Sequence, residues 1–265
     1  MPDFSNITVV GIHGNGGIGS MIPAVKKTAA GLPGCRTLLL GDTAVETDIT
    51  QKRTGSFDYV GYSHFVIYCL YQFIETDYVL IVQDDGWALN PANWRNEWFD
   101  YDYIGGITHA ALCGTDFKTN YLWVGYPNPA IVQNGGFSLR SRALLEAPSK
   151  YGITMKSVPH VMLTNEDVQL CCFMRPTLER KGLKFAPYEE ALIFAVEHLA
   201  PGVHDDLDLH TVYGHHGKFR RLVGDTEVLW SMPIEEVQTT YGERRIVDLF
   251  HHYGYTLLSP ETRPC

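Results

Sequence analysis

The sequence predicts an α/β fold in which a mostly parallel central sheet is flanked by helices. Residues 7–12, 37–40 and 78–82 are apolar, β-branched runs, which is the pattern of strands buried on both faces. Residues 21–30 lie between the first two runs and carry apolar side chains at helical spacing. A strand, a helix and a second strand in this order form the βαβ unit from which parallel sheets are built.

Composition is typical of a soluble globular protein, and the length suits one large α/β domain or two small ones. The chain has 265 residues, of which 45% are hydrophobic and 19% charged, so it is long enough to bury a large core. The formal net charge is -9, so the protein lacks the excess of basic residues that nucleic-acid-binding proteins carry. Nucleic acid is therefore not an expected partner. The six cysteines are scattered without a C-x-x-C pair, which favours buried free thiols in a reducing compartment. No apolar run reaches the length of a membrane span and no secretory signal is visible, so we expect a cytoplasmic protein.

The first strand runs into a glycine-rich loop. Gly14, Gly16 and Gly19 form the pattern G-x-G-x-x-G, and Asp42 ends the next strand, as in the dinucleotide-binding fingerprint. One hypothesis is therefore an NAD(P)-binding oxidoreductase. The alternative is that the glycines only allow a sharp turn from strand to helix. Backbone N–H groups here and the Asp42 carboxylate could meet any nucleotide, so the pattern indicates nucleotide binding more strongly than NAD.

The central strand, residues 78–82, ends in Gln83, Asp84, Asp85 and Gly86. Two adjacent carboxylates at the end of a buried strand are costly unless they meet water, a hydrogen-bond donor or a metal. Ligands of open α/β sheets bind at this end of the strands. A hard divalent cation takes oxygen ligands and in turn binds phosphates. The stretch is compatible with a metal–diphosphate site and equally with a polar turn.

Two predicted loops and a helix surround this strand. Residues 43–56 are expected to form a polar loop, and residues 62–74 a helix with Ser63 near its start. Residues 105–130 contain glycines and prolines with few regular runs, and a loop of this length is often a functional lid.

A short strand at residues 130–133 precedes Asn134, Gly135, Gly136 and Phe137, and residues 138–147 are expected to be helical. The Asn-Gly-Gly sequence is compatible with a tight turn. It is also compatible with unobstructed backbone beside a ligand, because neither glycine carries a side chain.

Asn165, Glu166 and Asp167 precede a helical pattern over residues 168–180. Asn165 as N-cap and two acids in the first turn would satisfy the helix end and its dipole. Further on, His215 and His216 lie between two glycines, where a neutral imidazole could bind a metal. From residue 225 onward the pattern indicates mixed helix and loop without an assigned function.

The order of these motifs is more specific than any one of them. A nucleotide-binding βαβ unit, an acidic strand end, a glycine loop, an acidic pair opening a helix and a late histidine follow one another. This order resembles the GT-A type of nucleotide-sugar glycosyltransferase. More narrowly, the chain is similar to a poorly characterised group of bacterial and viral glycosyltransferase-like domains, through the phrases VLIVQDDG, YDYIGG, NGGFSLRS, NEDV, KFAP and GHHG.

The resemblance implies a single GT-A-like (Rossmann-like) domain over residues 1–217, with residues 218–265 as a helical and loop extension packed on it. Asp85 would bind Mn²⁺ or Mg²⁺ and His216 would be the second protein ligand, with His215 the weaker candidate. Asp167 would be the catalytic base, and Glu166 would bind substrate hydroxyls.

The remaining predicted site residues would contact the donor and the acceptor. Those along the nucleotide are Gly11, Asp42 and Ser63, and Gln83 and Asp84 belong to the acidic motif, in which Gln83 replaces the usual first acid. Those beside the donor sugar and acceptor are Asn134, Gly135, Gly136 and Phe137.

The expected activity is transfer of a sugar from a nucleoside-diphosphate sugar, with UDP favoured, to a carbohydrate or other hydroxyl acceptor with inversion. A metal would stabilise the departing diphosphate, and a carboxylate would remove the acceptor proton. Besides the NAD(P) oxidoreductase, two alternatives are a non-catalytic nucleotide-sugar-binding module and a transferase acting on modified bases in nucleic acid.

Overall fold

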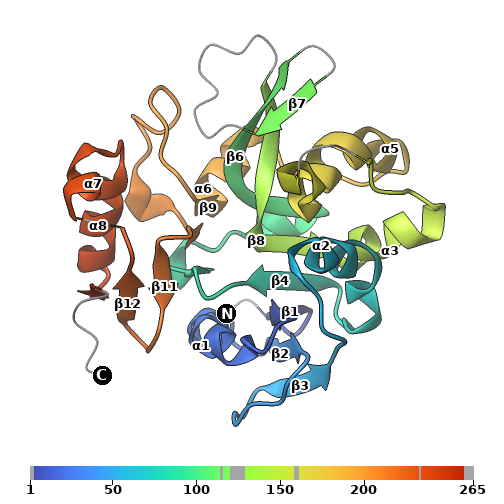
Figure 1. The fold of residues 1–265 in the computed structure, drawn as a ribbon, viewed down its shortest axis with the longest axis horizontal. Coiled ribbons are helices and arrows are strands. Elements are labelled where there is room, and N and C mark those ends of the chain that lie inside the picture. The colour runs from blue at the N-terminus through green and yellow to red at the C-terminus, as the bar shows by residue number, and fades with distance from the viewer. Residues whose placement is uncertain (1–2, 114–115, 120–128, 158–160, 233, 260–265) are drawn as a thin grey trace.

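One central sheet organises the chain (Figure 1). The computed structural model describes residues 3–113, 116–119, 129–157, 161–232 and 234–259. Within these ranges seven strands pair in the order β3-β2-β1-β4-β8-β6-β7. Four neighbouring strands are parallel, namely β3 (Thr50–Arg53), β2 (Arg36–Gly41), β1 (Ile7–His13) and β4 (Tyr78–Val82). The other three continue the sheet by antiparallel pairing, namely β8 (Pro129–Ser141), β6 (Tyr103–Cys113) and β7 (Asp116–Thr119).

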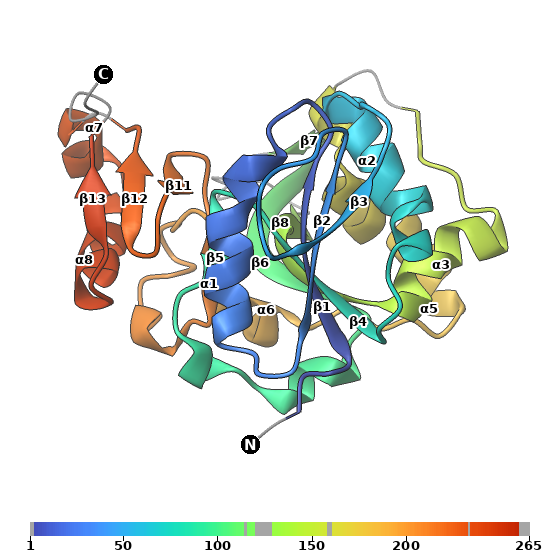
Figure 2. The same cartoon turned by 90° about the horizontal axis from the view of Figure 1, so that it is seen from below.

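Helices cover both faces of this sheet because alternate residues of its strands point to opposite sides. Val9 of β1 belongs to the same buried cluster as Val25 of α1 (Ile22–Ala30). The next residue, Val10, belongs to the cluster that contains Val66 of α2 (Tyr59–Tyr68) and Leu145 of α3 (Arg142–Tyr151). Figure 2 shows α1 and α2 on opposite sides of β1 and β2. The predicted α/β class is therefore confirmed, although the sheet is mixed because β8 runs against β4 and β6.

The pairing of β6 with β8 is interrupted by a bulge. Gly105 pairs with Ser138 and Ile107 pairs with Gln133, so residues 134–137 stand opposite a single residue of β6. A bulge bends the strand and re-aims its residues, and such irregularities are frequent beside active sites. The Asn-Gly-Gly-Phe sequence is thus a bulge inside a long strand, and the loop and early helix predicted there are wrong. The strand continues to Ser141 because Phe137 and Leu139 are buried in the core.

Shorter elements complete the α/β part of the chain. The 3₁₀ helices are η1 (Ile18–Met21), η2 (Leu70–Gln72), η3 (Pro91–Asn93), η4 (Asn96–Asp100), η5 (Val161–Thr164) and η7 (Leu209–Thr211). The helix predicted over residues 168–180 exists as three joined pieces, namely α4 (Glu166–Val168), the π-helical η6 (Gln169–Met174) and α5 (Arg175–Arg180). After α6 (Tyr188–Phe194), a small sheet pairs β5 (Gly86–Ala88), β10 (Gly214–His216) and β9 (Ala195–Val196).

The segment after residue 217 contains a third sheet as well as helices. Its elements are β11 (Arg220–Leu222), β12 (Glu227–Trp230), α7 (Ile234–Thr239), α8 (Glu243–His252) and β13 (Thr256–Leu258). The prediction of helix and loop alone is therefore wrong, because strands of three or four residues give too short an alternation to be recognised. Phe250 and Val228 share a buried cluster with Val9 and Leu80, so this segment packs on the α/β part of the chain.

Two predicted loops contain strands. Residues 43–56 include β3, a polar strand of sequence TQKR that pairs with β2 and ends the central sheet as far as the structure describes it. Residues 105–130 include most of β6 and all of β7, while residues 114–115 and 120–128 of the predicted lid lie outside the described residues. Gly105 pairs with Ser138 inside β6, and glycine is needed there because a Cβ would come 2.2 Å from the Asn134 carbonyl oxygen. Of the helices described, none has the length and hydrophobicity needed to cross a membrane.

Candidate active site

A cleft of about 730 Å³ opens beside the ends of β1 and β4 and the bulge of β8. It is lined by most of the residues that the sequence predicts for the site, namely Ser63, Gln83, Asp84, Asp85, Asn134, Gly136, Glu166, Asp167 and His216. These residues come from segments far apart in the sequence, so the fold gathers the separate motifs at one place. The carboxyl ends of the parallel strands lie here, as expected for the ligand site of an open α/β sheet.

The acidic motif is a tight turn at the end of β4. The Gln83 amide donates to the Gly86 carbonyl at 3.1 Å, and the Gly86 amide donates back to Gln83 at 2.9 Å. The carbonyl of Asp84 accepts from the Leu222 amide and that of Asp85 from the Gly217 amide, both at 2.8 Å. The turn is therefore fixed from both sides, by its own bonds and by the chain that follows His216.

His216 contacts the acidic turn through its Nε2 atom. This atom lies 3.2 Å from Oδ1 of Asp85 and 3.2 Å from Oε1 of Gln83, whose Nε2 donates to the Tyr62 hydroxyl at 3.1 Å. Burial alone would raise the pKa of Asp85, but the charge and hydrogen bond of His216 outweigh it and lower that pKa. Burial lowers the pKa of His216, yet the Asp85 and Glu197 carboxylates raise it well above its usual value. The two side chains therefore form an ion pair when no other cation lies between them.

The donor atoms around His216 fit a divalent cation. The imidazole Nε2 of His216 lies 3.2 Å from a carboxylate oxygen of Asp85 and 3.2 Å from the amide oxygen of Gln83. Across the described ranges, no group of three or more His, Cys, Asp or Glu side chains forms a complete metal site. A cation held by Asp85 and His216 would therefore take its other ligands from water and from substrate phosphates, which is the usual way of binding Mg²⁺ in phosphate sites.

The two glycines of the bulge make room for this arrangement. A Cβ on Gly136 would lie 2.4 Å from Nε2 of His216 and 2.7 Å from Oε1 of Gln83. A Cβ on Gly135 would lie 1.8 Å from Oε1 of Glu166. Both positions require glycine because side chains of the site itself fill the space that a larger residue would need.

Asp167 lies on the other side of the same bulge. Its Oδ2 accepts from the Gly135 amide at 3.1 Å, and its Oδ1 accepts from the Val168 amide at 2.7 Å. Burial, followed by the neighbouring Glu166 charge, raises the pKa of Asp167 to about 7 against the lowering effect of these two hydrogen bonds. Asp167 can therefore exchange a proton near neutral pH, which suits a general base.

Glu166 is held by a buried arginine of β8. Nη2 of Arg140 donates to Oε1 of Glu166 at 2.9 Å, and the Arg140 side chain is fully buried. The same Nη2 atom also contacts the Gly135 carbonyl at 3.3 Å. Asn165 occupies the N-cap position as predicted but makes no capping hydrogen bond with its side chain. The acidic pair is thus positioned by Arg140 and the glycine bulge rather than by side-chain capping.

Some predicted site residues lie elsewhere. Phe137 is fully buried in the core and does not line the cleft. Gly11 lies within β1, where a Cβ would come 2.7 Å from Met21 of the first helical turn. His215 is buried with its ring 4.1 Å from that of Trp87. These residues support the site from the core, because alternate residues of a strand face opposite sides.

The glycine-rich loop uses its own polar groups. Oδ1 of Asp42 accepts from the Gly16 amide at 2.9 Å, and Oδ2 accepts from the Ser56 hydroxyl at 2.7 Å. Nδ1 of His13 lies 3.2 Å from the amide nitrogens of both Asn15 and Gly17. A dinucleotide would need these amides for its pyrophosphate and Asp42 for its ribose. The NAD(P)-binding alternative is therefore not favoured.

The cleft contains further charged residues that the motif analysis did not identify. Glu197, Lys218 and Arg221 line it. Nε of Arg221 lies 3.8 Å from Oδ2 of Asp84, and burial followed by the Asp85 charge raises the pKa of Asp84. The sequence does contain a signal for Glu197, because this single acid directly follows the apolar run of residues 191–196. Lys218 and Arg221 belong to the basic stretch of residues 218–221, which follows the histidine motif.

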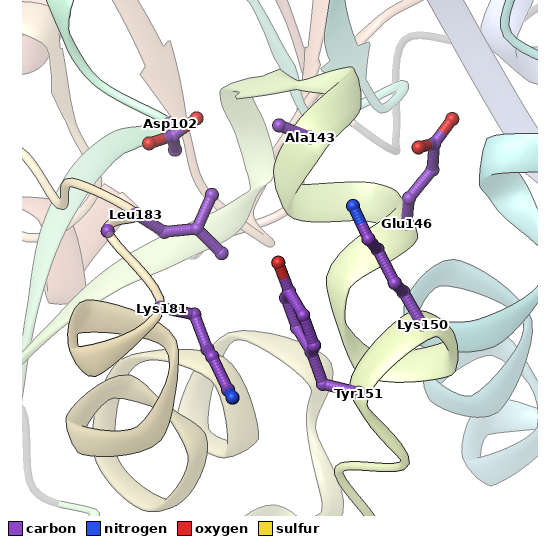
Figure 3. Close-up of a pocket in the computed structure, with 8 residues that line it drawn as sticks. Asp102, Ala143, Glu146, Lys150, Tyr151, Lys181 and Leu183 are labelled. Carbon is purple, nitrogen blue, oxygen red and sulfur yellow. The ribbon is translucent and has the colours of Figure 1, made fainter.

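A second cavity of about 290 Å³ lies apart from this cleft, beside α3 and the chain after α5 (Figure 3). Lys150 and Lys181 lie 5.5 and 4.9 Å from the ring centre of Tyr151. The two acids of the cavity already have partners. The Asp102 carboxylate accepts hydrogen bonds from the Ser141 hydroxyl and the Lys184 amide, and Glu146 forms an ion pair with Arg142. None of the predicted site residues lines this cavity.

The protein is thus an α/β protein with an acidic cleft at the carboxyl ends of its parallel strands. Residues 49–216 match the sequence model of a family described as "Protein of unknown function (DUF5672)", and the chain belongs to this family. The matched segment contains Asp85, Asp167 and His216 but not the glycine-rich loop. No match is found among curated proteins.

Three solved structures illustrate the distant structural similarity. The galactosyltransferase LgtC, in complex with donor and acceptor sugar analogs, is 14% identical, with 96% of this chain and 98% of that chain covered and a TM-score of 0.44. Its active-site mutant Q189E is 15% identical over 92% and 95% of the two chains, with a TM-score of 0.42. The bifunctional IspDF from Campylobacter jejuni is 9% identical over 68% and 48%, with a TM-score of 0.35.

Proposed function

We propose that the protein is a metal-dependent glycosyltransferase that moves a sugar from a nucleoside-diphosphate sugar, with UDP favoured, to a hydroxyl acceptor. The observation that carries this proposal is the arrangement around the β8 bulge. Gly136 packs against His216, the partner of Asp85, while the adjacent Gly135 donates to Asp167. The proposed cation-binding pair and the base candidate therefore contact adjacent residues of the bulge and line one cleft.

The Asp85 end of the cleft suits the leaving group. A nucleoside diphosphate departs with negative charge, and a divalent cation bound by Asp85 and His216 would supply the charge stabilisation that this departure needs. Lys218 and Arg221 line the same cleft and add two positive charges beside the acidic turn. Their attraction to the diphosphate would offset the cost of bringing it close to Asp84 and Asp85.

The Asp167 end of the cleft suits the acceptor. An alcohol is a weak nucleophile until a base removes its proton, and a base works best when its pKa lies near the working pH. The pKa of Asp167, raised to about 7 by burial and the Glu166 charge, meets this condition. Attack on the sugar from the face opposite the diphosphate inverts the anomeric centre, with Glu166 holding a substrate hydroxyl.

The donor contacts of the proposal are those that line the cleft. Ser63, Gln83 and Asp84 remain candidates for the nucleotide, and Asn134 and Gly136 for the sugar. The proposed donor contacts do not include Gly11 and Phe137, because both lie in the core. They do not include Asp42 either, because its carboxylate accepts from the Gly16 amide of the glycine-rich loop.

A thermal-shift panel with UDP-, GDP-, CMP- and dTDP-sugars and NAD(P)H, each with and without Mn²⁺, tests the proposal. We expect stabilisation by one nucleotide sugar that requires Mn²⁺, together with slow release of its nucleoside diphosphate when water acts as acceptor. Stabilisation by NAD(P)H alone would favour the oxidoreductase. Metal-dependent binding without release with any acceptor would indicate a non-catalytic binding module.

A further inference from the structure

Three buried charged residues are not explained by the predicted motifs. Glu197 follows β9, Arg220 opens β11 and Glu243 opens α8, and their exposed fractions are 6%, 0% and 1%. A buried charge is costly unless it is paired and hydrogen-bonded. The contacts of these three residues connect the C-terminal segment to the imidazole of His216.

Glu197 contacts the edge of the His216 ring that faces away from Asp85. Its Oε1 lies 3.5 Å from Nδ1 of His216, and its Oε2 accepts from the Thr108 hydroxyl. At 3.5 Å the carboxylate and Nδ1 are close enough for an ion pair but too far apart for a well-aligned hydrogen bond. In the described part of the chain, Nδ1 has no hydrogen-bond partner. Hydrogen bonds of catalytic sites are often long before substrate binds, so Glu197 at 3.5 Å is an acceptor placed next to Nδ1 of His216.

Arg220 fixes the backbone that carries Glu197. Its Nη2 donates to the Glu197 carbonyl at 2.9 Å, and its Nη1 donates to Oε2 of Glu243 at 2.8 Å. A Cβ on Gly217 would lie 2.0 Å from Nη2 of Arg220, so the glycine after His216 leaves the space that the guanidinium occupies. The guanidinium also lies 5.4 Å from the ring centre of Trp230 in β12.

We propose that Glu197 is a positioning residue that holds Nδ1–H of His216 and directs Nε2 toward Asp85, and that the C-terminal segment maintains it through the Arg220–Glu243 pair. This inference rests on the proposed role of His216 as a metal ligand. A histidine ligand needs its second ring nitrogen fixed by an acceptor, because that bond sets the tautomer and the orientation of the ring. Through the Arg220–Glu243 pair, α8 thereby gains a function in the site, although none of its residues lines the cleft.

Mn²⁺ binding in the absence of any substrate tests this role. The dissociation constant is measured from the electron paramagnetic resonance signal of free Mn²⁺ for the wild type and for E197Q and E197A. Because the amide of Gln can accept weakly from Nδ1–H while Ala cannot, we expect a graded loss that reaches about 10–100-fold in E197A. Glu197→Gln keeps the size of the side chain, so it remains informative should Glu197→Ala fail to fold.

Two changes on α8 separate the effect of the buried pair from a general effect of the helix. E243Q, which weakens the contact with Arg220, should weaken Mn²⁺ binding less than E197A. D248N removes an exposed pair with Arg244 at 3.2 Å and should leave Mn²⁺ binding unchanged. If the wild type binds Mn²⁺ and both E197Q and E197A bind it with the wild-type dissociation constant, the positioning role is overturned while the proposed function stands. Absence of Mn²⁺ binding in the wild type, with or without UDP, would instead contradict the proposed function.

Discussion

The backbone amide of Gly135 donates a hydrogen bond of 3.1 Å to Oδ2 of Asp167. This bond joins the bulge of β8 to the start of α4 and favours the ionised form of the carboxyl group. Burial and the charge of Glu166 act in the opposite direction and are stronger, so the pKa of Asp167 is raised to about 7. The protonation of this one side chain therefore changes within the range in which most enzymes work.

The first prediction concerns the pH dependence of turnover. Because only the ionised form of Asp167 can accept a proton, kcat/KM should rise about tenfold per pH unit below a pKa of about 7 and level off above it. Release of nucleoside diphosphate from the stabilising donor, measured from pH 5 to 9, gives this profile. Asp167→Asn should retain donor binding and lose turnover throughout the range. Near-normal turnover of this variant would show that Asp167 is not the base.

The second prediction concerns stability and follows from the same pKa. Because the pKa of Asp167 is higher in the folded protein than its usual value of 3.8, the folded state holds a proton that the unfolded state releases. The stabilising contribution is complete below about pH 4 and is lost as the pH rises through about 7. Each pKa unit corresponds to about 1.4 kcal/mol. The difference in Tm between the wild type and Asp167→Asn should therefore decrease as the pH is raised from about 4 to about 7. A difference in Tm that stays constant over this range would contradict the assigned pKa.

The third prediction concerns the close packing at Gly136. A methyl group there would come 2.4 Å from Nε2 of His216 and must displace the ring. Gly136→Ala should cost about 1–3 kcal/mol in the free energy of unfolding and abolish Mn²⁺-dependent binding of the donor. Gly55→Ala is the matched control, since its Cβ would meet nothing within 4 Å. Calorimetric titration of both variants measures the difference, and unchanged donor affinity in Gly136→Ala would argue against His216 as part of the site.

The fourth prediction concerns the buried ion pair between Arg140 and Glu166, the residue before the proposed base. Arg140→Met should destabilise the protein by about 3–5 kcal/mol, because it leaves Glu166 without its partner at 2.9 Å. The double variant with Glu166→Gln should recover part of this loss, since the uncompensated buried charge is removed as well. Denaturant unfolding of the two single variants and the double variant measures the coupling. Additive effects would mean that the two side chains do not interact energetically.

The sequence predicted the parts of this structure that depend on local patterns. The apolar runs that form β1, β2 and β4 are continuous, and the acidic turn after β4 is where a buried strand must meet solvent. These features specify an α/β sheet and the edge at which the cleft opens. The predicted residues of four separate motifs accordingly line one cleft.

The features that escaped prediction depend on contacts between distant segments. The glycines at positions 105, 135 and 136 resembled loop residues, yet they lie in β6 and in the bulge of β8, where other parts of the chain approach too closely for a side chain. The importance of Glu197 arises only when β9 and β10 pair and bring it next to His216. Within the described residues β3 is the edge strand of the central sheet, and its exposed polar sequence could not be recognised from hydrophobicity.

The central claim is that Asp85 holds a cation that stabilises a departing nucleoside diphosphate. Its most direct test is the Mn²⁺-dependent release of nucleoside diphosphate by the wild type and by Asp85→Ala, with the donor that stabilises the wild type. Release by the wild type that requires Mn²⁺, and its loss in a folded Asp85→Ala protein, is the predicted result. Equal release by both proteins, or release by the wild type that is independent of metal, would contradict the claim.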